Sequence, residues 1–370
     1  MKRAATGQHF RRPRNKTGTT DTAHVRSAPP PTQPKPRKEA PPQNAASPRQ
    51  FTVSLAISAS MIANIEKPEL RTFLAGQIAR CLTIMQIDEV VIYEDATSPG
   101  NVVPKTSTEG AYESAAKKNL DASIFLARIL QFCECPPYLR KALFPIHRDL
   151  QFASMINIES PHHTRIDDPC PFREGVTLET DRPDGTLVDC GLRNGIPCFV
   201  KDKAIKPGVR VTVKIDNPAQ IFHNNTQSVP ATVISPNFPR ESQGIYWGYN
   251  VRLASSIGKV LSESSYEGGY DLTFGISESA PYIGDIVGKE TKEDGTEGLP
   301  PFKHMMVVFG GSKGIEYSIE SDETVNFGED DIKNMFTYFV RTLKSQGTRR
   351  IRTEENVLIG MTAIRNYLPQ

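Results

Sequence analysis

The sequence has no run of about 18 apolar residues, no CxxC pair and no nucleotide-binding glycine motif of the common kinds. Without a long apolar run, no segment is expected to span a membrane. The cysteines do not fall at zinc-ligand spacing, and the "CEC" pair at 133–135 is too close for a zinc knuckle. We therefore expect reduced, mostly buried thiols in an intracellular protein. The six cysteines are Cys81, Cys133, Cys135, Cys170, Cys190 and Cys198.

Metal ligands are also scarce. His162 and His163 are adjacent, but no acidic or cysteine partner lies at ligand spacing. On an extended segment, adjacent side chains point in opposite directions, so we expect these two imidazoles to diverge. The sequence therefore predicts no metal site.

Two glycine motifs that would identify a nucleotide site are missing. The stretch "GGSKG" at 310–314 lacks the GK[ST] ending of a Walker A loop. No GxGxxG follows the first predicted strand. These absences argue against a nucleoside triphosphate, a nicotinamide enzyme and a Rossmann-type methyltransferase.

Charge is concentrated at one end of the chain. Residues 1–50 hold eleven Lys/Arg, two Asp/Glu and nine prolines, a local net charge of +9, while the whole chain carries +2 and residues 51–370 therefore −7. Such a segment buries too little apolar surface to offset its ordering entropy, so we expect a disordered basic arm. It has no apolar core typical of a secretory signal, and its proline density disfavours a transit peptide. It is interpreted as a tether to nucleic acid or a nuclear-targeting stretch, or alternatively as a solvated spacer.

An α/β pattern begins after the arm. Residues 51–58 predict a strand, residues 67–86 a helix with Pro68 in its first turn, and residues 88–95 a buried strand, which together form a parallel β-α-β unit. The predicted apolar face of the helix is formed by Leu70, Leu74, Ile78 and Leu82.

Further helices and strands are predicted after this unit. We expect a polar loop at 96–118, helices at 120–135 and 136–144, and a strand at 149–158. The α/β pattern returns at 250–261, 270–277 and 304–311, with a loop at 284–298 and helices at 331–340 and 353–368.

Between these two α/β parts, the composition changes to short strands and turns. Five strand-like runs separated by "PDG", "RNG" and "KPG" fit a small Greek-key barrel of the OB type. The predicted organisation is a basic arm at 1–50, α/β parts at 51–169 and 251–370, and an inserted OB-like barrel at 170–250.

The last seventy residues carry the candidate site. "MMVVF" is fully apolar and predicts a strand buried on both faces of a parallel sheet. Gly310, Gly311 and Gly314 follow it and allow the backbone to approach a ligand closely. Because ligands bind at the carboxyl ends of parallel strands, we expect a small molecule over this turn.

A second loop, residues 346–352, precedes the final helix and carries three arginines. Thr353 is a candidate N-cap, with Glu354 and Glu355 in the first turn. The predicted buried face of the helix is Val357, Met361, Ile364 and Leu368. Taken alone, this segment is better interpreted as a basic surface turn followed by a capped helix.

Three segments together carry a resemblance to a known family. "GGSKGIE", "QGTRRIRTEENVLIGMTAI" and "ELRTFLAGQIARCL…DEVVIYED" are similar to SPOUT-superfamily RNA methyltransferases. The chain most resembles the archaeal and eukaryotic subfamily with an inserted OB-type domain, which includes a centromere-associated member. The resemblance spans residues 51–370 in consistent order, and the basic arm lies outside it.

The resemblance implies a SPOUT-type knotted parallel sheet with a C-terminal trefoil knot, which is rare among proteins. It also implies S-adenosylmethionine bound in the knot mainly by backbone groups, and a homodimer whose RNA site is shared between subunits. The cofactor-binding residues that it implies are Phe309, Gly310, Gly311, Gly347, Arg350, Ile351, Arg352, Thr353 and Asn356.

Three residues are candidates for the chemistry. Arg80 in "GQIAR" matches a position where related enzymes carry a functional arginine, or else it contacts phosphate or lies free on the surface. Arg352 is a candidate for orienting the base. Glu354 is either a general base or a complement to the helix dipole.

The barrel is expected to bind RNA by basic side chains and one stacking ring. Each of these residues has an ordinary structural or solvated role as its alternative. Single-stranded or loop RNA is favoured, because a paired base would first have to be flipped out. The candidates are Arg193, Phe199, Lys201, Lys203, Lys206 and Arg210.

The combined prediction is an S-adenosylmethionine-dependent RNA methyltransferase that modifies ribosomal RNA, with a uridine base favoured over ribose. The alternative is a non-catalytic RNA- or chromatin-binding adaptor that retains the fold. We expect a nuclear or nucleolar protein, with the cytoplasm as the alternative location.

Overall fold

The computed structural model describes residues 47–95, 115–166, 168–179, 182, 184–218, 227–287, 298–322 and 332–369. The basic arm predicted at 1–50 lies outside these residues except for its last four positions, as do most of the loops predicted at 96–118 and 284–298. Among the described helices, none is long and apolar enough to cross a membrane.

A parallel sheet forms the centre of the described chain. Its six described strands pair in the order β11-β9-β10-β1-β2-β8, and every neighbouring pair is parallel. The strands are β1 (Thr52–Ser58), β2 (Glu89–Tyr93), β8 (Asn250–Ala254), β9 (Leu272–Ile276), β10 (His304–Phe309) and β11 (Tyr338–Val340).

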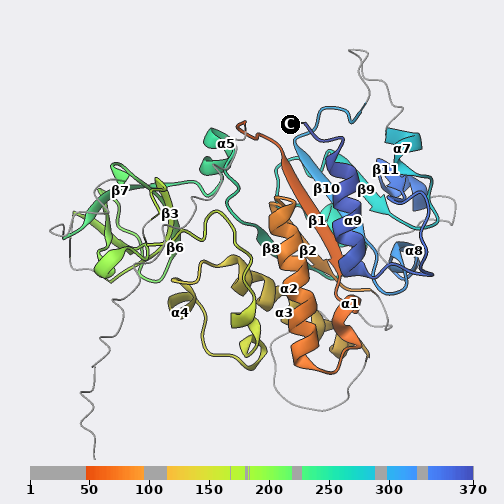
Figure 1. The fold of residues 1–370 in the computed structure, drawn as a ribbon, viewed down its shortest axis with the longest axis horizontal. Helices are drawn as coiled ribbons and strands as arrows, with labels where there is room; N and C mark the ends of the chain where they lie inside the picture. The colour runs from red at the N-terminus through yellow and green to blue at the C-terminus, as the bar shows by residue number, and fades with distance from the viewer. Residues whose placement is uncertain are drawn as a thin grey trace, which may run out of the picture. The chain divides into compact units, whose positions relative to one another are not determined.

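Helices cover both faces of the sheet, and Figure 1 shows α2 and α9 lying across it. One face packs against α1 (Ser60–Ala63), α2 (Pro68–Ile84), α3 (Ala115–Glu134) and α9 (Thr353–Arg365). The other face packs against α6 (Ile257–Ser262) and α8 (Ile315–Glu320). The remaining short helices are α4 (Arg140–Leu143), α5 (Phe238–Gln243) and α7 (Ile283–Ile286).

The predicted central strand is confirmed. β10 lies between β9 and β1, and its side chains alternate between the two cores: Met305, Val307 and Phe309 face one, and Met306 and Val308 the other. A strand buried on both faces must be apolar throughout, which explains the continuous apolar run in the sequence.

A closed barrel is inserted between α4 and β8. Its five described strands pair in the order β3-β4-β5-β7-β6, and all pairs are antiparallel except β5 with β7. A separate small core, which includes Val188, Val200 and Val213, fills it. The strands are β3 (Phe172–Thr177), β4 (Gly185–Asp189), β5 (Cys198–Lys201), β6 (Arg210–Ile215) and β7 (Val229–Ile234).

Two predicted elements are wrong. Residues 331–340 were expected to be helical, but they form a short 3-10 turn at Ile332–Met335 and the edge strand β11. The aromatic residues of β11 find hydrogen-bond partners along β9, and this pairing outweighs local helix propensity.

Residues 149–158 were expected to form a strand, but they contain two 3-10 turns, Arg148–Leu150 and Ala153–Met155. This segment packs against α2, where a side chain at Gly76 would come within 3.0 Å of Ile156. The predicted apolar face of α2 is also shifted, because Ile78 and Leu82 are buried whereas Leu70 is 52% exposed.

Two buried carboxylates and one arginine link the barrel to the α/β part. The guanidinium of Arg210 on β6 donates to both carboxylate oxygens of Glu134 on α3, at 2.6 and 2.9 Å. Its Nε donates to Glu174 of β3 at 2.6 Å. Glu174 also accepts from Trp247 Nε1 at 2.6 Å, in the segment that returns to the sheet.

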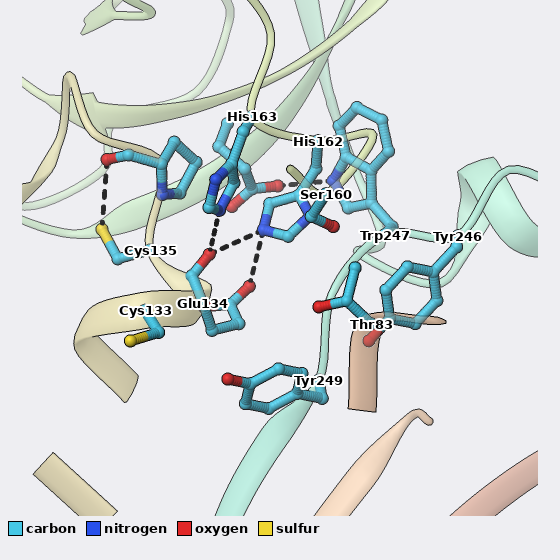
Figure 2. A network of polar contacts seen from close by, with 12 residues as sticks. Thr83, Cys133, Glu134, Cys135, Ser160, His162, His163, Tyr246, Trp247 and Tyr249 are labelled. Atoms are coloured by element: carbon cyan, nitrogen blue, oxygen red, sulfur yellow. Dashed lines mark hydrogen bonds and ion pairs between the residues drawn. The ribbon is translucent and has the colours of Figure 1, made fainter. Parts of the chain in front are cut away.

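The two histidines lie in the same network, and both rings point toward the end of α3 in Figure 2. Nε2 of His162 and Nε2 of His163 lie 2.8 and 2.7 Å from the carbonyl oxygen of Glu134. The expectation that their side chains diverge is therefore wrong, because the segment turns instead of running extended. Across the described part of the chain, no cluster of three or more His, Cys, Asp or Glu residues is placed to hold a metal ion.

Gly248 permits the close crossing of these segments. Its φ is +90°, and a Cβ there would lie 2.4 Å from Glu134 Oε1 and 2.8 Å from His162 Cε1. The returning chain therefore passes directly over the ion pair, and only glycine fits at this position.

The network shifts the pKa values of its members. Burial acts to raise the pKa of Glu134, but Arg210 and then His162 outweigh it and lower the value to about 2. Burial, followed by the proximity of His162, lowers the pKa of His163 to about 3. Glu134 is therefore charged and His163 neutral at physiological pH.

Replacing Arg210 by methionine should destabilise the protein by about 3 kcal/mol, because two buried carboxylates lose their shared counter-charge. We place the loss at the low end of the usual range since 31% of the Arg210 side chain is exposed. Urea unfolding measures the effect. The exposed Arg193→Met is the matched control and should change stability by less than about 0.5 kcal/mol. An equal effect of the two changes would contradict a structural role for Arg210.

Stability should also fall below about pH 6.5, because His163 takes up a proton when unfolded but stays neutral when folded. From the two pKa values, the loss at pH 5.5 is about 1.4 kcal/mol. His163→Gln retains a donor for Glu134 O and should remove this part of the pH dependence, as urea unfolding at pH 7.5 and 5.5 would measure. Glu134 contributes little in this window, since its stabilisation is lost only below the ordinary glutamate pKa of 4.5. Parallel pH curves for the two proteins would refute the prediction.

Candidate functional site

A pocket of about 310 Å³ opens at the carboxyl ends of β9 and β10. It lies where a ligand was expected from the sequence, above the glycine turn that follows β10. Its lining residues are Ile276, Ser277, Glu278, Ser279, Gly310, Gly311, Ser312, Lys313, Gly314, Ile315, Glu316, Arg350, Ile351, Thr353 and Asn356.

The turn after β10 requires glycine at two positions. A Cβ at Gly310 would lie 2.1 Å from the backbone nitrogen of Ile315. A Cβ at Gly311 would lie 2.1 Å from Ser60 Oγ and 2.4 Å from Asp95 Oδ2. The amide of Gly314 donates to Gly311 O at 3.1 Å and closes the turn. The floor of the pocket is therefore bare backbone, tightly packed from below.

The loop before α9 forms the opposite wall. Arg350 Nη1 donates to Ser312 O at 2.9 Å, and Thr353 Oγ1 donates to Gly310 O at 3.3 Å. The glycine turn and the loop before α9, about forty residues apart in sequence, thus meet in one pocket. Neither segment by itself was sufficient to predict a ligand site.

Carboxylates line the third wall, which is formed by the segment after β9 and by Glu316 of α8. Glu316 accepts hydrogen bonds from the hydroxyls of Ser277 and Ser279. Glu278 accepts from the backbone amide of Ile351 at 3.1 Å. These two carboxylates lie on one side of the pocket, whose lining also includes the cations Lys313 and Arg350.

The sequence analysis missed this third wall. Ser277, Glu278 and Ser279 directly follow the strand β9 and belong to the same sheet edge as Gly310. The rule that predicted a ligand over Gly310 applies equally to the polar residues after each neighbouring parallel strand. The polar residues 277–279, which directly follow a predicted strand, are therefore the sequence feature from which this wall could have been predicted.

Of the predicted cofactor residues, Gly310, Gly311, Arg350, Ile351, Thr353 and Asn356 line the pocket. Phe309 is fully buried beneath it, and a Cβ at Gly360 of α9 would lie 2.7 Å from its ring. Gly347 is exposed in the loop away from the lining residues.

The predicted N-cap of α9 is wrong by one residue. The helix begins at Thr353, so the N-cap position belongs to Arg352. The amide of Arg352 donates to Glu355 Oε2 at 3.1 Å, as expected for an acidic residue in the first turn. The hydroxyl of Thr353 reaches back to Gly310 instead, which couples the helix start to the glycine turn.

None of the three candidates for the chemistry is among the lining residues, and Arg352 is at the N-cap position of α9. Arg80 is on the outer side of α2, where its guanidinium donates to Ile158 O at 3.2 Å and lies 3.8 Å from Glu159 Oε2. Glu354 is in the first turn of α9, next to the lining residue Thr353.

The barrel candidates fall into two groups. In the first group, four basic residues are exposed. The candidate stacking ring, Phe199, is half-buried, and the guanidinium of Arg182 lies 5.5 Å from its centre. Arg210 differs, because Glu134 and Glu174 engage its guanidinium. The exposed residues are Arg193, Lys201, Lys203 and Lys206.

Comparison with known proteins places the chain in a family. A family model described as "Putative RNA methyltransferase" matches residues 52–364. A Mus musculus protein named 28S rRNA (uridine-N(3))-methyltransferase is 42% identical over 327 residues, which are 87% of this chain and 78% of the mouse protein. The Homo sapiens protein of the same name is 40% identical over 327 residues, 87% of this chain and 80% of its own length.

A more distant relative extends the comparison to insects. The Drosophila melanogaster protein of that name is 36% identical over 324 residues, 87% of this chain and 63% of its own length. The family match runs from β1 to the last turn of α9 and so includes both walls of the pocket that are formed by the glycine turn and the final loop. The chain therefore belongs to this family of RNA methyltransferases.

Proposed function

We propose that this protein transfers a methyl group from S-adenosylmethionine to N3 of a uridine in ribosomal RNA. The observation that carries the proposal is the pocket built from the glycine turn and the final loop, within a chain 40% identical to a human protein named for that reaction. A non-catalytic adaptor is less favoured, because the mouse, human and fly relatives are all named as methyltransferases.

The pocket residues suit this cofactor. S-adenosylmethionine supplies, when bound, a methyl group on a positively charged sulfur. Glu278 and Glu316 provide negative charge beside it, whereas the pocket offers no phosphate cradle of the Walker type. The bare backbone of Gly310 and Gly311 permits close approach, and we assign the opposite wall to Arg350, Ile351, Thr353 and Asn356.

Placement supplies most of the rate in such a transfer, because the reacting atoms must be aligned. The N3 proton of uridine must also leave, so a group that accepts it or stabilises the charge is required. Arg352 and Glu354, at the start of α9, remain our candidates for orienting the base and receiving the proton. No step is assigned to Arg210, since buried carboxylates already bind it.

We further propose that the fold is of the SPOUT type, with the C-terminal segment forming a trefoil knot. Two observations support this: the loop before α9 contacts the turn after β10, and α9 then packs against α2. The barrel order supports an OB-type module within residues 170–250, flanked by α/β parts at 51–169 and 251–370.

We propose that the barrel grips single-stranded RNA by its exposed basic side chains, with Phe199 as the stacking ring. Phosphate contacts of this kind should make RNA binding fall with salt. A nuclear or nucleolar location, with the basic arm as a targeting or RNA-binding segment, is part of the same proposal and is supported by the charge of residues 1–50.

A homodimer is proposed from an apolar stripe on α2. Leu70, Phe73 and Ile84 are 52, 62 and 53% exposed, and their spacing places them on one helix face together with Arg80. A second copy covering this face would bury the stripe and bring Arg80 to a shared site.

Calorimetry tests the enzyme proposal directly. We expect micromolar binding of S-adenosylmethionine by the wild-type protein and loss of binding on Gly311→Trp, because no side chain fits beneath the turn. Ser242→Ala on α5 is the control and should bind normally. Nucleosides of ribosomal RNA from cells lacking the protein should lose one methylated uridine by mass spectrometry. A folded wild-type protein that produces no binding heat would instead support the adaptor.

The dimer proposal has its own test. Phe73→Asp should convert the protein from dimer to monomer in light scattering after size-exclusion chromatography, because a charge cannot be buried in the stripe. Val209→Asp, at another exposed apolar position, on the barrel (41% exposed), should leave the dimer intact. A wild-type monomer would rule the dimer out.

A further inference from the structure

A chain of hydroxyl groups lies directly under the glycine turn of the pocket. We call it the hydroxyl chain and define it as Ser58, Ser60, Asp95, Ser318 and Tyr93. These residues come from the ends of β1 and β2, from the start of α1 and from α8. All but Ser60 are buried, and the Asp95 carboxyl group at its centre belongs to a residue only 4% exposed.

Asp95 sets the direction of every hydrogen bond near it. Ser60 Oγ donates to Asp95 Oδ2 and Ser318 Oγ donates to Asp95 Oδ1, each at 2.5 Å. A carboxylate only accepts, so the single proton of the Ser60 hydroxyl is committed to Asp95. Toward every other neighbour, Ser60 Oγ must therefore act as an acceptor.

Two donors fill the lone pairs of that oxygen. The amide of Ser312 donates to Ser60 Oγ at 3.3 Å. Ser58 Oγ lies 2.8 Å from Ser60 Oγ and must donate, since the Ser60 proton is already used. Every hydrogen-bonding position of the Ser60 hydroxyl is then occupied, and the Ser312 amide is held in one orientation.

The hydroxyl chain grips the turn at a second point. The hydroxyl of Tyr93 donates to Phe309 O at 2.8 Å, just before the glycines. Burial, followed by the charge of Asp95, raises the pKa of Tyr93 well above its usual value, so this donor keeps its proton. The backbone is thus fixed on both sides of Gly310 and Gly311.

The same residue is bound from above through its other peptide unit, which it forms with Lys313. Ser312 O accepts from Arg350 Nη1 at 2.9 Å, the hydrogen bond that joins the final loop to the glycine turn. Ser312 is therefore held at its nitrogen by the hydroxyl chain and at its oxygen by Arg350. An error in its orientation would displace the acceptor that Arg350 needs in order to close the pocket.

We propose that Asp95 and Ser60 are positioning residues for cofactor binding. They hold the Gly311–Ser312 peptide and thereby fix the position of Ser312, whose carbonyl Arg350 needs in order to close the pocket. Neither side chain is among the residues that line the pocket, so both act through the turn above them. This inference rests on the proposed function only in taking S-adenosylmethionine as the ligand.

Isothermal titration with S-adenosylmethionine alone tests the inference, using the full chain and no RNA. Ser60→Ala should raise the Kd about tenfold, and Asp95→Ala at least as much. Ser321→Ala is the matched control: its hydroxyl donates to Tyr317 O at the end of α8, outside the hydroxyl chain, and its Kd should be unchanged. The melting temperature of Ser60→Ala should stay near that of the wild type, so this variant carries the test even where Asp95→Ala folds poorly.

A double variant separates positioning from general loosening. If Ser60 acts through Ser312 on Arg350, then Ser60→Ala combined with Arg350→Ala should bind no more weakly than Arg350→Ala alone, within about twofold. Multiplication of the two single effects would overturn the inference, as would a wild-type Kd for Ser60→Ala. A wild-type protein that binds no S-adenosylmethionine would overturn the proposed function and with it this inference, whereas the other two outcomes reject the inference alone.

Discussion

The parallel pairing of β10 between β9 and β1 is the constraint on which the candidate site depends. When a strand is buried on both faces and hydrogen-bonded on both sides, its register and direction are fixed. Its carboxyl end must then emerge beside those of its neighbours. Ser58, Ser277 and Gly310 consequently lie together at the carboxyl ends of the strands, although they are far apart in the sequence. The pocket is a result of this convergence.

At the carboxyl ends of these strands, exposed main-chain groups and charged side chains have different roles. The glycine turn offers main-chain groups, and the hydroxyl chain beneath it keeps those groups in place. The third wall adds the carboxylates of Glu278, after β9, and of Glu316, on α8. The final loop adds Arg350, whose contact with Ser312 encloses the space. The walls are formed by segments that follow three different strands, β9, β10 and β11, which is why no single motif identifies the site.

The sequence predicted the parts whose patterns are local. The β-α-β start, the continuous apolar strand and the five barrel strands follow from periodicity and turn residues, and the structure confirms them. The buried face of α9 is confirmed for Val357, Met361 and Ile364, whereas Leu368 lies beyond the end of the helix and is half-buried. The failures occur where distant partners decide. Tyr338–Val340 became a strand because β9 offered a free edge, and His162 turned beside His163 because both bind the end of α3. Arg210 was judged by its charge, but its neighbours Glu134 and Glu174 are 76 and 36 residues away.

By itself, the sequence determined an α/β protein with an inserted β-barrel, a glycine turn after a central strand and a basic loop before the last helix. These features depend on spacing and residue type within short windows, where side-chain periodicity and backbone freedom act directly. Only the tertiary structure decided that the turn and the loop share one pocket, that residues 277–279 after β9 and Glu316 of α8 form its third wall, and that Asp95 lies beneath it. Those facts depend on the order of parallel strands, and strand order is set by the packing of the whole sheet.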